Sequence, residues 1–150
     1  LPKELGHTAE ARDSGNIDHF PWGGAWPPAK GSGNYTGEET GSEVAIKGYR
    51  DDFQYTAPVA SFPANSNGLF DLGGNVWEWC LDHWRDHYQN IPKDGSPWVG
   101  KGIFGVFRGH VLRGGSWCDS AKHCRSGSRN RHLSDKNNLG FRVVCSNRNR

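Results

Sequence analysis

The four cysteines carry the most reactive side chains in this chain. They stand at positions 80, 118, 124 and 145, an even number in which no two have CxxC spacing. Thiolates bind soft metal ions, but a structural zinc site is built from closely spaced pairs, so the spacing argues against zinc. Cys80 and Cys145 each end a strand-like run and are expected to be buried thiols or a pair. The redox compartment stays open.

A second candidate for metal chemistry is the HxxxH pair formed by His83 and His87, with Asp82 and Asp86 beside it. A helical turn would place both imidazoles on one face, where they could bind a transition metal. A third ligand is not evident, so an exposed polar turn is the expected structure.

The elements that position these groups must come from a small and unusual composition. The 150 residues give room for one domain, 1–150, with one core. Hydrophobic residues make up 34%, with 21 Gly, 8 Pro and 7 Trp, which favours short strands, long loops and indoles in the core. No apolar run approaches the roughly 18–20 residues of a membrane span. The chain begins at Leu1 and has no Met, which indicates the C-terminal portion of a longer chain.

Local patterns predict few regular elements. A short helix is expected over 3–13, and strands over 76–81, 111–117 and 140–145. The segments 20–70 and 89–101 are rich in turn residues and are expected to be irregular. A loop as long as 20–70 is unusual in a compact domain, and a bound metal ion would account for its order.

Charge is distributed unevenly along the chain. Residues 111–150 hold nine Lys and Arg against two acidic residues, whereas residues 1–110 carry a net negative charge. Such a basic quarter could face an acidic ligand or nucleic acid. We expect several of its arginines instead to bond loop carbonyls and carboxylates within the domain. No nucleic-acid recognition motif supports specific binding of DNA or RNA.

Three motifs together carry a family resemblance. Residues 68–79 (GLFDLGGNVWEW), 112–117 (LRGGSW) and 139–144 (LGFRVV) occur in an order and spacing that resemble the formylglycine-generating (sulfatase-modifying factor) branch of the C-type lectin fold. The resemblance runs from about residue 20 to residue 144, includes the segments 20–23, 56–59 and 62–65, and extends weakly back to residues 1–4. It implies an α+β domain with short strands, long loops and little helix. Because function belongs to sites rather than folds, the activity must be argued separately.

The resemblance implies two structural calcium sites. The first set comprises the side chains of Asp71 and Glu78 with the carbonyls of Gly74 and Val76. The second set comprises the side chains of Asn34 and Asp51 with the carbonyls of Tyr35 and Phe53. Hard oxygen ligands from irregular backbone suit Ca²⁺. Spacing alone would favour ordinary turn and ion-pair roles for these residues.

The resemblance also locates the copper ligands of the catalytic members. These are two thiolates, at the second and seventh positions after the aromatic residue of the Gly-Gly-Ser motif. Counted from Trp117, the seventh position is Cys124, but the second is Asp119. A carboxylate cannot replace a thiolate for Cu(I), and Cys118 stands one residue early, where an extended segment points its side chain the opposite way. We therefore assign no catalytic residue and expect Cys124 to be a small buried hydrophobe; an oxidase would have to use Cys124 with Cys118.

The same segment resembles the diversified surface of the variable proteins of diversity-generating retroelements. Residues 118–133 have no hydrophobic period and lie between two motif anchors. The candidate ligand-binding residues there are Cys118, Asp119, Ser120, His123, Gly127, Ser128, Arg131, His132 and Leu133. All are products that mutation of adenines in AAY codons can give. Lys122 and Lys136 cannot arise in this way and would be invariant residues of the scaffold. The alternative is an ordinary solvated loop that is not diversified.

The resulting hypothesis is a non-catalytic binding domain with a protein ligand and structural Ca²⁺. The alternatives are a copper-dependent oxidase that converts a peptide cysteine to formylglycine, and an accessory domain, for instance of a kinase, docked through its basic face. Copper is expected only for the oxidase. The ligand, the oligomeric state and the compartment stay open, with a cell-surface, secreted or virion-associated location compatible with a binding role.

Overall fold

The computed structural model describes residues 19–100, 109–132 and 136–143 of the chain. Its centre is one four-stranded sheet in the order β3-β2-β1-β4. The strands are β1 (Trp77–His83), β2 (His110–Arg113), β3 (Asn130–His132) and β4 (Leu139–Gly140). β2 pairs antiparallel with both β1 and β3, and β4 pairs parallel with β1. Two short 3-10 turns, η1 (Glu38–Thr40) and η2 (Ala121–Cys124), are the remaining elements in these ranges.

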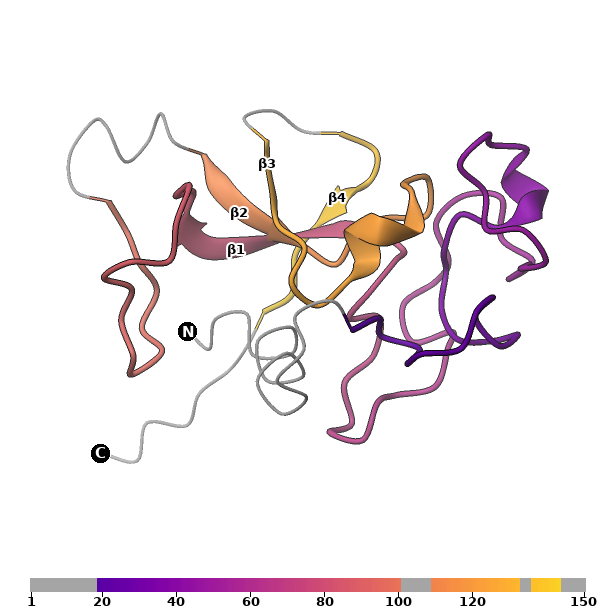
Figure 1. Ribbon diagram of the computed structural model, residues 1–150, viewed down its shortest axis with the longest axis horizontal. Helices are drawn as coiled ribbons and strands as arrows, with labels where there is room; N and C mark the ends of the chain where they lie inside the picture. The colour runs from indigo at the N-terminus through magenta and orange to yellow at the C-terminus, as the bar shows by residue number, and fades with distance from the viewer. Residues whose placement is uncertain (1–18, 101–108, 133–135, 144–150) are drawn as a thin grey trace.

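Irregular chain surrounds the sheet on two sides. Figure 1 shows the segment 20–70 gathered beside η2 and the segment that follows β1 at the opposite end of the sheet. Between residues 20 and 70 only η1 is regular, and residues 89–100 contain no helix or strand, as the turn residues predict. The expectation of an α+β domain with short strands, long loops and little helix is confirmed.

The C-terminal ends of β2 and β4 differ from the expected strands. β2 ends at Arg113 rather than at Trp117, because Gly114 and Gly115 have φ of 95° and 73° and turn the chain out of the sheet. β4 contains two residues, and Phe141 leaves the ladder. The end of that expected strand, with Cys145, and the expected helix 3–13 lie outside the described residues.

The largest apolar cluster lies in the loop region rather than against the sheet alone. It joins Tyr35, Ile46 and Tyr49 of the irregular segment to Ala121 and Cys124 of η2, with Phe20 and Trp22 packed against it. Tyr49 is 1% exposed and donates its hydroxyl to the Gly33 carbonyl. Aromatic burial of this kind orders a segment that has almost no regular hydrogen bonding. In the described ranges no helix is long and apolar enough to cross a membrane.

Candidate functional site

The segment between β2 and β3 lies where the sheet meets the irregular loops. Gly115 starts it in a left-handed conformation that also brings its backbone against Cys124: a Cβ there would lie 2.8 Å from Cys124 Sγ. Ser116 follows and is completely buried. The glycine pair of the second motif, 112–117, therefore turns the chain and lets η2 pack closely on that turn.

Asp119, which stands at the expected position of the first copper thiolate, points into the protein. Its Oδ2 accepts a hydrogen bond of 2.7 Å from the Trp77 indole and a second bond from the Ser116 hydroxyl. Its backbone carbonyl accepts a 2.5 Å bond from the Thr36 hydroxyl. This one residue thus connects β1, the turn after β2 and the irregular segment, so its carboxylate is a structural acceptor.

Cys124, at the second thiolate position, is part of the apolar cluster. Its side chain is 2% exposed, and burial, with the nearby Asp119 charge as a second cause, raises the pKa of its thiol to about 12. A thiol with such a pKa stays protonated at neutral pH in the metal-free protein. The expectation that Cys124 is a small buried hydrophobe is confirmed.

Cys118 faces a different set of neighbours. Its Sγ lies 3.4 Å from the Ser116 hydroxyl and 3.5 Å from the Asn138 amide nitrogen, and it is only half-buried. Cys118 and Cys124 both carry free thiols. The two sulfurs are therefore held by different contacts, one by polar side chains and one by the apolar cluster.

The other candidate binding residues are distributed along the same segment. Ser120 precedes η2 without capping it through its side chain, and the His123 ring lies 5.8 Å from the Trp77 ring, edge-on. Arg113 of β2 donates to the carbonyls of Ser126 and Ser128, and so fixes the backbone on either side of Gly127. Arg131 and His132 lie on β3, where Arg131 is exposed; Leu133 lies outside the described residues.

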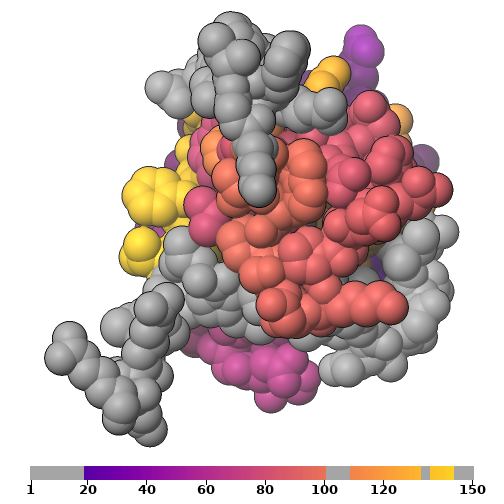
Figure 2. All heavy atoms as spheres, turned by 90° about the vertical axis from the view of Figure 1, so that its left-hand side faces the viewer, coloured from indigo at the N-terminus to yellow at the C-terminus, as the bar shows by residue number. Residues whose placement is uncertain are grey.

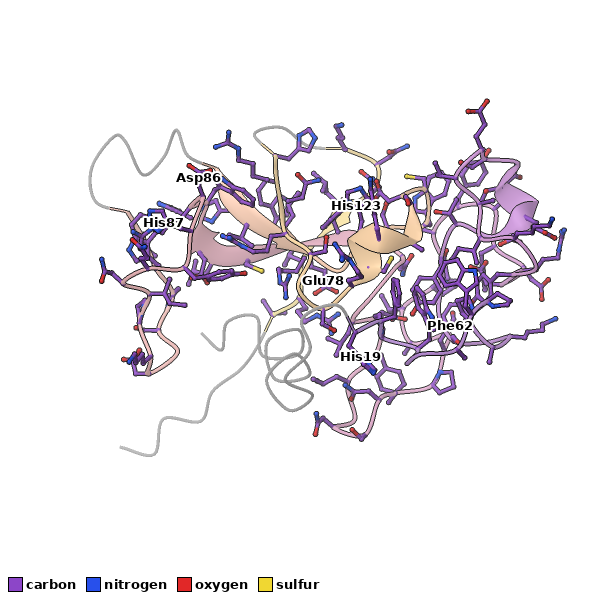
Figure 3. All side chains as sticks on the ribbon, viewed as in Figure 1. His19, Phe62, Glu78, Asp86, His87 and His123 are labelled. Carbon is purple, nitrogen blue, oxygen red and sulfur yellow. The ribbon has the colours of Figure 1, made fainter. Side chains whose placement is uncertain are left out.

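The HxxxH pair does not form a helical turn. His83 is the last residue of β1; its ring lies 4.7 Å from that of His110 and accepts the Gly100 N–H. His87 is exposed beyond the strand, and Figure 3 shows it with Asp86 at the end of the sheet opposite His123. His83 is in a strand rather than in a helical turn because β1 is paired with β2 as far as His83, which lies opposite His110. In the described ranges no group of three His, Cys, Asp or Glu side chains could hold a metal ion.

The second calcium set is held together by one buried carboxylate. Asp51 is 5% exposed and accepts the N–H groups of Tyr35 and Phe53 at 2.8 and 2.9 Å. Burial raises the pKa of Asp51, and the neighbouring Glu39 acts in the same direction. Asn34 Oδ1 is buried and accepts no hydrogen bond from the part of the chain that the structure describes. An unpartnered amide oxygen beside a desolvated carboxylate suits a hard cation that also draws on backbone carbonyls.

The first calcium set lines a pocket of about 510 Å³ that contains Asp71, Gly74, Val76 and Glu78 together. One of its two carboxylates is already paired with an arginine. Arg142, from the third motif, pairs with both carboxylate oxygens of Glu78 and donates to the carbonyls of Phe70 and Asp71. Asp71 Oδ2 accepts the Ala60 N–H at 2.7 Å. A cation here would have to share Glu78 with a guanidinium.

Several residues that hold this site were missed by the sequence reasoning. Trp77, Ser116 and Asn138 all lie within the three motifs or beside them, but nothing in their spacing shows that they meet around Asp119 and Cys118. Arg113 and Arg142 fulfil the general expectation that arginines bond loop carbonyls.

A small mixed sheet, long aromatic-packed loops and a Gly-Gly-Ser turn beside η2 define a C-type lectin fold of the formylglycine-generating type. The chain belongs to the family of sulfatase-modifying factor enzyme 1-like domains, whose model matches residues 1–147. The mouse (Mus musculus) formylglycine-generating enzyme is 36% identical over 152 residues, which cover 97% of this chain and 38% of the enzyme.

Two solved structures are similar over nearly the whole chain. PvdO from Pseudomonas aeruginosa has a TM-score of 0.69 and 31% identity, covering 94% of this chain and 50% of PvdO. Treponema denticola variable protein 1 has a TM-score of 0.61 and 29% identity, covering 94% of this chain and 45% of that protein. The chain therefore spans half or less of the length of each of these relatives.

Proposed function

We propose that this chain is a non-catalytic ligand-binding domain that presents residues 118–133 as its binding face. The observation that carries the proposal is the position of Asp119. Its carboxylate stands where the resemblance to catalytic members requires the first copper thiolate, and it is bonded to Trp77 and Ser116. A hard oxygen ligand in that place does not suit Cu(I), which selects soft thiolates.

The remaining thiols, of Cys124 and Cys118, do not make up for the missing thiolate at position 119. Cys124 is buried among apolar side chains, and the pKa of its thiol, raised to about 12 by burial, keeps it protonated. Cys118 faces Ser116 and Asn138 instead. The two sulfurs thus have different neighbours, polar side chains for Cys118 and the apolar cluster for Cys124, which supports a binding role over an oxidase.

Copper titration tests the proposal. The reduced chain is titrated under argon against a coloured Cu(I)–bicinchoninate complex, beside the Cys124→Ser variant. We expect neither protein to withdraw copper from the indicator. Withdrawal of one equivalent by the wild-type chain, lost in Cys124→Ser, would support the copper-dependent oxidase instead.

The similarity to Treponema denticola variable protein 1 supports a binding face that varies between copies of the gene. Sequencing the flanking DNA tests this part of the proposal. A near-copy of the 3′ region that differs only opposite adenines, beside a reverse transcriptase gene, would identify the variable codons. Their absence would leave a binding face of fixed sequence.

Calcium bracing of the loops is a further part of the proposal. The set around Asn34 and Asp51 is supported by the buried, unpartnered Asn34 Oδ1 and by the raised pKa of Asp51. In the set around Asp71 and Glu78, a calcium ion would share Glu78 with Arg142. Calcium would there act as a structural cross-link between loops, with no role in chemistry.

Thermal unfolding with and without EDTA measures this bracing. We expect calcium to raise the Tm by roughly 5 °C at saturating concentration, because a ligand that binds only the folded chain stabilises it. Asp51→Asn should remove the increase, whereas Asp52→Asn, which alters an exposed neighbour paired with Lys30, should retain it. Asp71→Ala tests the other set in the same way. An equal Tm with calcium and with EDTA would contradict the proposal.

A further inference from the structure

The end of the molecule beyond β1 holds a cluster of arginines stacked on aromatic rings. We define this arginine–aromatic cluster as Trp84, Arg85, Tyr88, Trp98, Arg129 and Arg131. Three of its residues follow β1 directly, Trp98 comes from the next loop, and the last two belong to the start and middle of the β3 region. Figure 2 looks onto this end of the molecule, where the segment after β1, coloured salmon, forms the centre of the face.

The contacts within the cluster are cation–π contacts. The Arg129 guanidinium carbon lies 4.6 Å from the Trp84 ring centre and 4.5 Å from that of Tyr88. Arg131 lies 5.6 Å from the Trp84 ring, and Arg85 lies 4.3 Å from the Trp98 ring. Each such contact attracts the guanidinium to the electron-rich face of the ring. The stacking also restricts the guanidinium groups before any partner arrives, which lowers the entropy cost of binding.

The positive charge of the cluster is not balanced within it. Across the described ranges, Arg85, Arg129 and Arg131 form no ion pair; the ion pairs found there join Lys30, Arg50 and Arg142 to acidic partners. Arg129 donates Nη2 to the Arg85 carbonyl, while its buried Nε and the buried Nη1 of Arg85 have no hydrogen-bond partner. Arg131 is exposed. These groups are held by rings and one carbonyl rather than by carboxylates.

Two acidic residues accept hydrogen bonds from members of the cluster. Asp82 accepts the Trp98 N–H at 2.8 Å, and Asp86 accepts the Trp84 indole N–H at 3.0 Å. Their charges reduce the local excess from three positive charges to one. This small excess suits one or two carboxylates better than a continuous chain of phosphates.

We infer that the arginine–aromatic cluster binds a carboxylate-bearing segment of a protein partner. The inference rests on the proposed function and specifies the partner of the same face, since Arg131 belongs to both. Guanidinium groups recognise carboxylates through their planar N–H edges. Single-stranded nucleic acid is recognised by bases that stack on aromatic faces, and here guanidinium groups already cover faces of Trp84, Tyr88 and Trp98. An acidic peptide therefore fits the cluster better than a nucleic acid.

Fluorescence anisotropy with three labelled probes tests the inference. The probes are a hexapeptide of alternating Glu and Gly, the same peptide with Gln in place of Glu, and a short single-stranded oligothymidine. We expect the Glu peptide to bind more tightly than the other two, with an affinity that decreases as salt is added. Arg131→Gln, a substitution at an exposed position, should weaken Glu-peptide binding roughly fivefold. Lys47→Gln removes an exposed charge outside the cluster and should leave the affinity unchanged.

Three results would overturn the inference: equal binding of the Glu and Gln peptides, an unchanged affinity in Arg131→Gln, or tighter binding of the oligonucleotide. Thermal unfolding of each variant shows whether it is folded. Copper titration separates this inference from the proposed function. If the chain withdraws no copper but binds the Glu and Gln peptides equally, the proposed binding function stands. Only the inference of an acidic partner is then wrong.

Discussion

The segment that joins β2 to β3 has two halves with opposite characters. In the inner half, residues 116–126, three polar or sulfur side chains are turned into the domain: Ser116 and Cys124 are buried, and Asp119 is bonded to β1. In the outer half, residues 127–132, Arg129 and Arg131 lie on aromatic rings and Arg131 is exposed. The inner half contains the two positions at which the resemblance implies copper ligands, Asp119 and Cys124. Both side chains are held by contacts within the domain. The outer half retains groups that can meet a partner.

Hydrogen bonds hold the backbone at the boundary between the halves, residues 126–128. Arg113 of β2 bonds the carbonyls of Ser126 and Ser128, and Ser126 donates its N–H to the His19 carbonyl. Because its backbone is fixed on both sides of Gly127, the outer half can change its side chains without disturbing the inner half. This separation of scaffold from surface is what a binding face requires.

The largest effect is expected at Gly115, the residue directly before the inner half, whose backbone lies against Cys124. Gly115→Ala places a Cβ 2.8 Å from Cys124 Sγ at a φ of 73°, so we expect a loss of about 3 kcal/mol in the free energy of unfolding. Gly41→Ala is the matched control, because Gly41 has a φ of 65° and nothing within 4 Å of the added carbon. That variant should lose only about 1 kcal/mol. Equal losses in urea denaturation would show that η2 does not pack tightly on the turn.

A smaller effect is expected at the carboxylate of the inner half. Asp119→Ala removes the acceptor of Trp77 and Ser116 and should cost about 2 kcal/mol of unfolding free energy. Asp52→Asn, which breaks an exposed ion pair with Lys30 and keeps a residue type that tolerates the φ of 72° there, should cost less than about 0.5 kcal/mol. If Asp119→Ala were as mild as its control in urea denaturation, Asp119 would not be a structural acceptor.

Thiol reactivity distinguishes the two cysteines of the inner half. Burial raises the pKa of Cys124 to about 12, so at about pH 8 it remains a protonated, inaccessible thiol and iodoacetamide should modify the half-buried Cys118 first. Raising the pH toward about 9 should not expose Cys124 unless the chain unfolds, because only the unfolded chain releases that proton near its ordinary pKa. Peptide mass spectrometry reads both sites. Modification of Cys124 at the rate of Cys118 would contradict its burial.

The local parts of this structure were predictable and the long-range parts were not. The alternating aromatic run at Trp77 predicts β1, and the turn residues between 20 and 70 predict irregular chain, because both depend on neighbouring residues. Asp119 meets Trp77 across 42 positions, and Arg129 meets Trp84 across a similar distance in the chain. No periodic pattern encodes such contacts. The end of β2 was misplaced for a local reason, since the left-handed glycines override the strand-like residues that follow them.

The central claim is that Asp119 closes the position at which a copper thiolate would stand, and exchanging that residue tests it most directly. Wild-type chain, Asp119→Cys and the double variant Asp119→Cys with Cys124→Ser are compared in the Cu(I)–bicinchoninate competition. We expect the wild-type chain to withdraw no copper, Asp119→Cys to withdraw one equivalent, and the double variant to withdraw none. Withdrawal of one equivalent by the wild-type chain itself would show that Asp119 does not close the copper position.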